Sequence, residues 1–244
     1  MTNPFSRREF TTLLVGAAAL TSTSHALAQD LASLKIATIG SGREGGGLGT
    51  LFAKAGHPVL FSSQHPEQLK DLVAAAGPRA RAGTVAEAVA FGDVIFLAVP
   101  YGAVEQIGRD FGAALAAKQL VIDASNPSAG RDGKELTDRV AAEGGPGLFT
   151  KKALKDAKVV RGFNAIGGGQ LAELSKRPAD QRAGVPIAGD DAKAIDLASR
   201  LIRAAGLEPV LIGNLAKGKY LVPGTPLSGV HSPAELRQIA AGLS

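Results

Sequence analysis

The sequence predicts an α/β fold with a doubly wound, mostly parallel sheet, on the basis of three observations. Short apolar runs rich in Val, Ile and Leu alternate along the chain with stretches of helical periodicity. These runs are continuously apolar, as in parallel strands that helices cover on both faces. A glycine-rich turn follows the first apolar run and opens a helix. Strands that alternate with helices form a parallel sheet with right-handed crossovers, and no repeat or clean linker divides this pattern.

The individual elements follow from the same periodicity. We expect strands at Lys35–Ile39, Val59–Phe61, Val94–Ala98, Leu120–Asp123, Val159–Val160 and Pro209–Ile212. We expect helices at Gly46–Ala55, Pro66–Ala76, Thr84–Ala90, Ala103–Ala117 and Asp191–Ala205. Pro66 suits the first turn of a helix, and Gly206 suits the position just after one. The segment 126–147 is polar and glycine-rich around one short helical piece, so we expect a surface loop or small insertion there.

The glycine-rich turn fits the pattern G-x-G-x-x-G, with Gly40, Ser41, Gly42, Arg43, Glu44 and Gly45 in order. Its place after a strand and before a helix is the context that a dinucleotide site requires. The glycines let the backbone approach a pyrophosphate, and the helix N-terminus offers free N–H groups to that anion. A carboxylate would repel a pyrophosphate, so we expect Glu44 to face solvent or to pair with Arg43. The alternative is a turn that only packs the helix on the strand.

The end of the second strand indicates which dinucleotide is preferred. NAD sites place an Asp or Glu there to bind the ribose 2′-hydroxyl, whereas this chain has Ser62, Ser63 and Gln64. Without an acid a 2′-phosphate is not repelled, so we expect NADP, with NAD as the alternative. No Arg is present to clamp that phosphate. These polar residues could instead only cap the helix that begins at Pro66.

The first 28 residues have the layout of a signal peptide. Arg7 and Arg8 precede a short apolar run, Leu13–Leu20, and Ala26-Leu27-Ala28 has the small-x-small pattern of a cleavage site. The run Ser6-Arg7-Arg8-Glu9-Phe10 resembles a bacterial twin-arginine signal, so we expect the translocation machinery as a partner and export to the periplasm. The apolar run is shorter than the ~20 residues of a stable membrane span. The alternative is a basic tail followed by a chance Ala-rich helix.

Composition limits the remaining classes of protein. Cleavage after residue 28 would leave residues 29–244 as one NAD(P)-binding domain with a short C-terminal extension. The whole chain has a net charge of +5 and is 45% hydrophobic, which is ordinary for a globular protein. Its basic residues are scattered and its aromatic residues few, so we expect no nucleic-acid partner. It has no cysteine, which excludes disulfides, thiolate catalysis and Cys-ligated metals. A homodimer is compatible with the sequence.

Several segments together resemble a known family. They are, in order, "KIATIGSGREGGGLGTLFAKAGHPV", "FSSQHPEQL", "DVIFLAVPYGAV", "VIDASNP", "VRGFN" and "PIAGDD". Over about residues 34–229 the chain resembles the NADP oxidoreductases that use a deazaflavin, the coenzyme called factor 420. The resemblance implies a Rossmann-type domain that transfers hydride between NADP and a deazaflavin. A related branch of the family uses ordinary flavin to reduce metal ions.

The resemblance also implies roles for individual residues. The glycine turn would bind the pyrophosphate, and Ser63 and Gln64 stand where members often have Ser-Arg at the 2′-phosphate. The backbone at Val99 and Pro100 would run beside the nicotinamide ribose. Asn126, Asn164 and Ala165 follow the next two strands, at the carboxyl edge where such folds bind ligands. Each Asn could instead hold its own backbone in a turn. In the C-terminal stretch, Lys217, Lys219 and Tyr220 would meet an acidic or aromatic ligand, or form a solvated loop.

Hydride transfer between two cofactors depends on stacking at the right distance more than on acid–base side chains, so we name no catalytic residue. No pair among His25, His57, His65 and His231 has ligand spacing, so we expect no metal site. The predicted function is an NADP-dependent oxidoreductase that passes hydride to a deazaflavin or flavin. The alternatives are an oxidoreductase of the same fold with a small organic substrate, and a dinucleotide-binding protein that is not an enzyme.

Overall fold

The computed structural model describes residues 31–243, and the expected signal peptide lies outside them. Contacts divide the chain into one unit that ends at Ser33 and a compact unit that begins at Leu34. Every strand of the described residues lies in the second unit. Among residues 31–243, no helix has the length and apolar character needed to cross a membrane.

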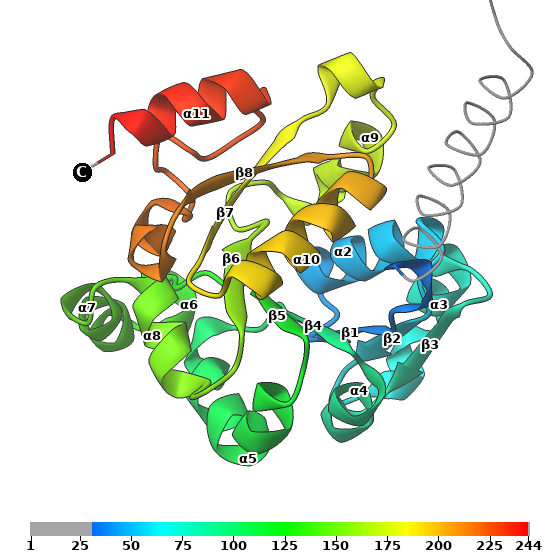
Figure 1. The fold of residues 1–244 in the computed structure, drawn as a ribbon. Helices are drawn as coiled ribbons and strands as arrows, with labels where there is room; N and C mark the ends of the chain where they lie inside the picture. The colour runs from blue at the N-terminus through cyan, green and yellow to red at the C-terminus, as the bar shows by residue number, and fades with distance from the viewer. Residues whose placement is uncertain (1–30, 244) are drawn as a thin grey trace, which may run out of the picture. The chain divides into compact units, whose positions relative to one another are not determined.

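The described residues form one eight-stranded sheet with the order β3-β2-β1-β4-β5-β6-β7-β8 (Figure 1). Strands β1 to β6 pair in parallel, β7 runs antiparallel to β6, and β8 is parallel to β7. This doubly wound order confirms the predicted fold class. The strands are β1 (Ile36–Ile39), β2 (Val59–Ser62), β3 (Ala80–Gly83), β4 (Val94–Leu97), β5 (Leu120–Asp123), β6 (Val159–Gly162), β7 (Gly184–Gly189) and β8 (Glu208–Gly213).

Helices cover both faces of the sheet, with α2 and α10 on one side and α4 and α5 on the other (Figure 1). The α-helices are α2 (Arg43–Lys54), α3 (Lys70–Ala76), α4 (Val85–Phe91), α5 (Val104–Ala116), α6 (Ala129–Asp132), α7 (Lys134–Ala142), α8 (Pro146–Ala153), α9 (Leu171–Leu174), α10 (Ala192–Ala204) and α11 (Pro233–Ala241). Short 3₁₀ turns are η1 (Pro66–Leu69), η2 (Tyr101–Ala103), η3 (Gly168–Gln170), η4 (Ala179–Gln181) and η5 (Leu215–Tyr220).

Alternate residues of the central strands point to opposite faces, as the two-residue period of a strand requires. Ala37 and Ile39 of β1 belong to the hydrophobic cluster that α4, α5 and α8 cover. On the other face, the Phe52 ring of α2 packs on the Phe96 ring of β4 with centroids 4.9 Å apart. Burial of both faces explains why these strands are continuously apolar in sequence.

The structure differs from the predictions from periodicity at several places. Strand β3 was missed because it is a partly exposed edge strand, and β7 because glycine, proline and alanine make up four of its six residues despite its burial. Helix α2 begins at Arg43, inside the glycine turn, and not at Gly46. The expected helix at 66–76 is divided into η1 and α3. The expected loop at 126–147 contains α6, α7 and the start of α8, because a short helix with one buried side chain leaves little apolar pattern.

Candidate functional site

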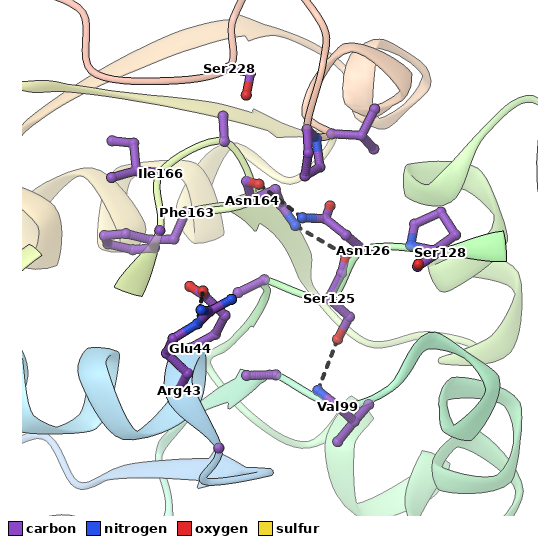
Figure 2. A pocket seen from close by; sticks show the side chains of 18 of the residues that line it. Arg43, Glu44, Val99, Ser125, Asn126, Ser128, Phe163, Asn164, Ile166 and Ser228 are labelled. Atoms are coloured by element: carbon purple, nitrogen blue, oxygen red, sulfur yellow. Dashed lines mark hydrogen bonds and ion pairs between the residues drawn. The ribbon is translucent and has the colours of Figure 1, made fainter. Parts of the chain in front are cut away.

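A cavity of about 820 Å³ opens at the carboxyl edge of the sheet, where β1, β4, β5 and β6 end (Figure 2). Residues that follow each of these strands line it, together with part of the C-terminal segment 222–229. The Gly229 N–H donates to Ala165 O at 2.8 Å, which ties this segment to the residues that follow β6. The volume is within the ~300–1,000 Å³ of typical ligand pockets. The cavity therefore lies where open α/β sheets bind their ligands.

The three glycines of the turn have different structural tasks. Gly40 has φ +87°, a backbone conformation that favours glycine, and a Cβ there would collide with the carbonyl of Ala98. A Cβ on Gly45 would collide with the carbonyl of Gly40, so both glycines are needed to close the turn. Gly42 lines the cavity, and apart from its two chain neighbours no described residue has an atom within 4 Å of where its Cβ would be. The turn thus leaves an open approach to the backbone, which fits a dinucleotide pyrophosphate.

Glu44 makes a long-range hydrogen bond that the sequence did not predict. Its Oε2 accepts a hydrogen bond from the Gly168 backbone N–H at 2.6 Å, across 124 residues of chain. The expected pair with Arg43 also forms, but with Nε and Oε1 3.8 Å apart and the Arg43 side chain 87% exposed. Glu44 therefore ties the first turn of α2 to the segment after β6 that walls the cavity. Its carboxylate is directed to that segment, which removes part of its conflict with a bound pyrophosphate.

The residues expected at the 2′-phosphate lie apart from the cavity wall. Ser62 is fully buried, and its Oγ has no hydrogen-bond partner within residues 31–243. Ser63 Oγ accepts from the His65 N–H at 3.0 Å, in the manner of a short polar turn, and Gln64 is exposed. None of these three residues is acidic. This strand end thus has neither the acid of an NAD site nor an arginine clamp.

Ser125 joins the ends of β4 and β5. The Val99 N–H donates to Ser125 Oγ at 3.2 Å, and Ser125 Oγ donates to Leu97 O at 3.2 Å. Val99 and Pro100 both line the cavity. Sequence reasoning did not select Ser125, although its place directly after a strand could have indicated it.

The two predicted asparagines join neighbouring strand ends. Asn126 Nδ2 donates to Asn164 O at 2.8 Å, and Asn164 Nδ2 donates to Asp123 O at 3.0 Å and to Ser125 O at 3.2 Å. Their partners lie on the neighbouring segment, which argues against turns that hold only their own backbone. Asn164 is buried and lines the cavity, and its Oδ1 has no partner among the described residues. This oxygen is itself buried, so Asn164 joins the two strand ends through its Nδ2 group.

A buried ion pair lies beneath these asparagines. Arg161 Nη1 donates to Asp123 Oδ2 at 2.6 Å, and both side chains are 0% exposed. Arg161 Nη2 donates to Asn126 Oδ1 at 3.1 Å and to Leu221 O at 3.2 Å. Asp123 also accepts from Thr150 Oγ1 at 2.8 Å. Arg161 thus connects β5, β6 and the segment just before residues 222–229.

Tyr101 extends this buried network without reaching the cavity. Its hydroxyl donates to Pro146 O at 2.8 Å and contacts Thr150 Oγ1 at 3.0 Å. Burial, and next the negative charge of Asp123, raise the pKa of Tyr101. The phenol therefore remains protonated at physiological pH and acts here as a structural hydrogen-bond donor.

Several lining residues were missed from the sequence, chiefly Phe163, Ile166, Gln170, Arg131, Val222 and Ser228. Phe163 has φ +67°, and its ring packs edge-on against Phe52 and Phe96. Such packing depends on tertiary contacts and leaves no local signal. Lys217 and Lys219 lie over the Tyr220 ring and do not line the cavity. Within residues 31–243 no group of three or more His, Cys, Asp or Glu could hold a metal ion.

Residues 35–127 match the family described as NADP oxidoreductase, coenzyme F420-dependent. The match runs from β1 to just beyond β5, so it includes the glycine turn and Asn126. It confirms the predicted resemblance over this part of the chain, short of the expected 34–229. The enzyme class predicted from the sequence, an NAD(P)-dependent oxidoreductase, is that of the matching family.

Solved structures extend the likeness in fold. A hypothetical protein from Sinorhizobium meliloti is 24% identical, with a TM-score of 0.67 over 82% of this chain and 95% of its own. A proposed F420-dependent NADP-reductase from Arthrobacter sp. is 18% identical, with a TM-score of 0.59 over 77% and 88%. An imine reductase from Myxococcus stipitatus in complex with NAD+ is 15% identical, with a TM-score of 0.54 over 77% and 57%. At these identities the likeness establishes the fold. Among curated proteins, no significant sequence match was found.

Proposed function

We propose that this protein is an NADP-dependent oxidoreductase that transfers hydride between NADP(H) and a deazaflavin or flavin. The single observation that carries the proposal is the glycine turn of the matched family opening into the cavity at the ends of β1, β4, β5 and β6. Residues that follow all four strands face one space. A ligand held at the turn would therefore extend past β4 toward the asparagines.

The lining of the cavity supports transfer between two cofactors over acid–base chemistry on an organic substrate. Among the described residues that line it, the ionisable side chains are Arg43, Glu44 and Arg131. Glu44 is engaged with Gly168, and arginine does not serve as a proton donor in proteins. Hydride transfer between two stacked rings needs no proton relay, so this lining is sufficient for it.

The residues present fit a dinucleotide. Gly42 and the N-terminus of α2 would hold the pyrophosphate, and the backbone at Val99 and Pro100 would lie along the ribose. Asn126 and Asn164 would wall the end of the site that lies away from the glycine turn. Bound NADP(H) would supply or accept the hydride. The side chains would bind it, orient it and exclude water from the reacting face.

The test is oxidation of NADPH by the purified protein, without oxygen, with a deazaflavin, FMN and riboflavin as separate acceptors. Turnover with any of them that requires the protein supports the proposal. Binding of NADPH without oxidation by any acceptor would favour the alternative of a non-enzymatic dinucleotide-binding protein. Turnover only with an imine, ketone or hydroxy acid would favour the small-substrate alternative.

We also propose that residues 1–28 direct export to the periplasm by the twin-arginine route, which moves folded proteins and so allows the cofactor to bind first. The motif at Arg7 and Arg8 supports this. Changing both to Lys should leave the precursor in the cytoplasm, because the translocation receptor reads the two guanidinium groups. Normal amounts of mature protein in the periplasm would disprove this route.

A further inference from the structure

Arg131 lies on the side of the cavity away from the glycine turn. The turn follows β1, whereas Arg131 belongs to α6, which follows β5, and β4 separates the two strands in the sheet. Figure 2 shows Arg43 and Glu44 on one side of the cavity and Ser128, three residues before Arg131, on the other. If the proposed function is correct, the dinucleotide lies at the turn, and Arg131 faces the space left for the hydride acceptor.

The Arg131 guanidinium is held in a fixed orientation. Its Nε donates to Asp132 Oδ1 at 3.1 Å, and its Nη2 donates to Asp132 Oδ2 at 2.8 Å and to Asn126 O at 2.6 Å. These three hydrogen bonds use the Nε hydrogen and both hydrogens of Nη2. The two N–H groups of Nη1 have no partner among residues 31–243, so they can donate to an anion in the cavity. An arginine oriented in this way loses little further freedom when it binds an anion.

Asp132 is a firm anchor for this arginine. Its side chain is only 2% exposed, whereas that of Arg131 is 49% exposed. Its carboxylate also accepts from the Ser128 N–H at 2.9 Å and the Gly102 N–H at 3.3 Å. Burial opposes ionisation of Asp132, but the hydrogen bonds from Arg131, Ser128 and Gly102 outweigh it and lower its pKa. The Asp132 carboxylate therefore stays charged at neutral pH, and hydrogen bonds from two backbone N–H groups stabilise that charge.

Few other residues that line the cavity carry a charge. Among the described lining residues, only Arg43 and Arg131 are basic, and the one acid, Glu44, lies on the side of the glycine turn. Val222 and Pro223 line the same cavity and offer apolar surface to a carbon skeleton. An anion beside Arg131 would thus meet the free N–H groups of Nη1, while the carboxylate of Asp132, which pairs with Nε and Nη2, is buried and does not line the cavity.

We propose that Arg131 binds an anionic group, a phosphate or carboxylate, on the hydride acceptor and so makes the protein select a charged acceptor over its neutral counterpart. This inference rests on the proposed function, because it assigns the far side of the cavity to the acceptor. Within that function it names a residue that determines specificity without taking part in hydride transfer.

The experiment compares FMN with riboflavin, which share one ring system and differ in a phosphate. Quenching of flavin fluorescence, in the presence of saturating NADP+, measures the Kd of each for the wild-type protein, Arg131→Gln and Arg131→Lys. Lys134→Gln is the matched control, because it removes one positive charge from the neighbouring helix α7 at an 81% exposed side chain that does not line the cavity. Circular dichroism melts and NADP+ titrations of every variant report on the fold and on the dinucleotide site.

We expect the wild type to bind FMN at least about tenfold more tightly than riboflavin, which is the effect of one charge-assisted hydrogen bond. Arg131→Gln should weaken FMN about tenfold and change riboflavin and NADP+ less than about twofold. Arg131→Lys should recover part of the FMN affinity, and Lys134→Gln should resemble the wild type. Equal changes for both flavins, no change for either, a loss of NADP+ affinity, or a wild type that binds neither flavin would overturn the inference.

The outcomes also separate this inference from the proposed function. FMN binding that depends on Arg131, without any oxidation of NADPH, would refute the oxidoreductase and retain the anion site. NADPH oxidation at equal rates with FMN and riboflavin in all variants would retain the oxidoreductase and refute the role of Arg131.

Discussion

At the scale of single residues, Gly42 is the most direct test of the dinucleotide site. Its φ of −70° is accessible to any residue, and the space beside it is open to the cavity. Gly42→Val should therefore preserve the fold and obstruct the pyrophosphate, with dinucleotide affinity reduced at least about tenfold, or ~1.4 kcal/mol. Isothermal titration and circular dichroism measure the two effects.

Gly40→Val is the contrasting variant for that experiment. At φ +87° and against the Ala98 carbonyl, a side chain on Gly40 strains the turn itself. It should lose both stability and binding. If Gly42→Val keeps its dinucleotide affinity, the turn serves only to pack the helix on the strand.

Gln64 tests the choice of cofactor at the same scale. Its side chain is exposed after β2, where no acid repels a 2′-phosphate and no arginine binds it. Gln64→Arg should strengthen NADPH binding by about 1.5–3 kcal/mol, the value of a charged hydrogen bond, and leave NADH unchanged. Titration of both nucleotides against both proteins measures this. A wild-type preference for NADH that the substitution does not alter would contradict the expected NADP specificity.

At the scale of the elements, Arg161 joins β5, β6 and the C-terminal wall of the cavity. Arg161→Leu leaves Asp123 buried without its counter-charge, so unfolding free energy should fall by about 3–5 kcal/mol. Adding Asp123→Asn should restore part of the loss, because the amide removes the buried charge and can still accept from Thr150. Urea denaturation measures all three proteins.

An exposed ion pair provides the control for this comparison. Lys134 and Asp138 lie one turn apart on α7 with side chains 81% and 61% exposed, so Lys134→Ala should change stability by less than about 1 kcal/mol. A double variant no more stable than Arg161→Leu would mean that the loss comes from packing and not from charge.

At the scale of the whole molecule, His57 makes stability depend on pH. It is buried, and its Nδ1 lies 3.2 Å from Leu34 O. Burial is the main cause that lowers its pKa below 6.5. Just below pH 6.5 the His57 side chain is therefore protonated in the unfolded chain while it is still neutral in the folded chain. The free energy of unfolding consequently decreases as the pH falls below 6.5.

His57→Gln should reduce the difference in unfolding free energy between pH 7.5 and pH 5.5, measured by urea denaturation. His65→Gln removes an exposed histidine, with a 65% exposed side chain, and should leave that difference unchanged. A wild-type slope that survives in His57→Gln would assign the pH dependence to other groups.

The sequence by itself determined the fold class, the strands β1, β2, β4, β5, β6 and β8, and some of the residues that line the cavity at the strand ends, among them Val99, Asn126 and Asn164. These signals are local, because burial on both faces makes a strand continuously apolar and a tight turn demands glycine at Gly40 and Gly45. Only the tertiary structure decided that β7 is antiparallel to β6, that Glu44 binds Gly168, and that Arg161 pairs with Asp123. It also brought Arg131 and residues 222–229 to the cavity. Those contacts join segments far apart in the chain, 124 residues in the case of Glu44, so no local pattern of residue types could indicate them.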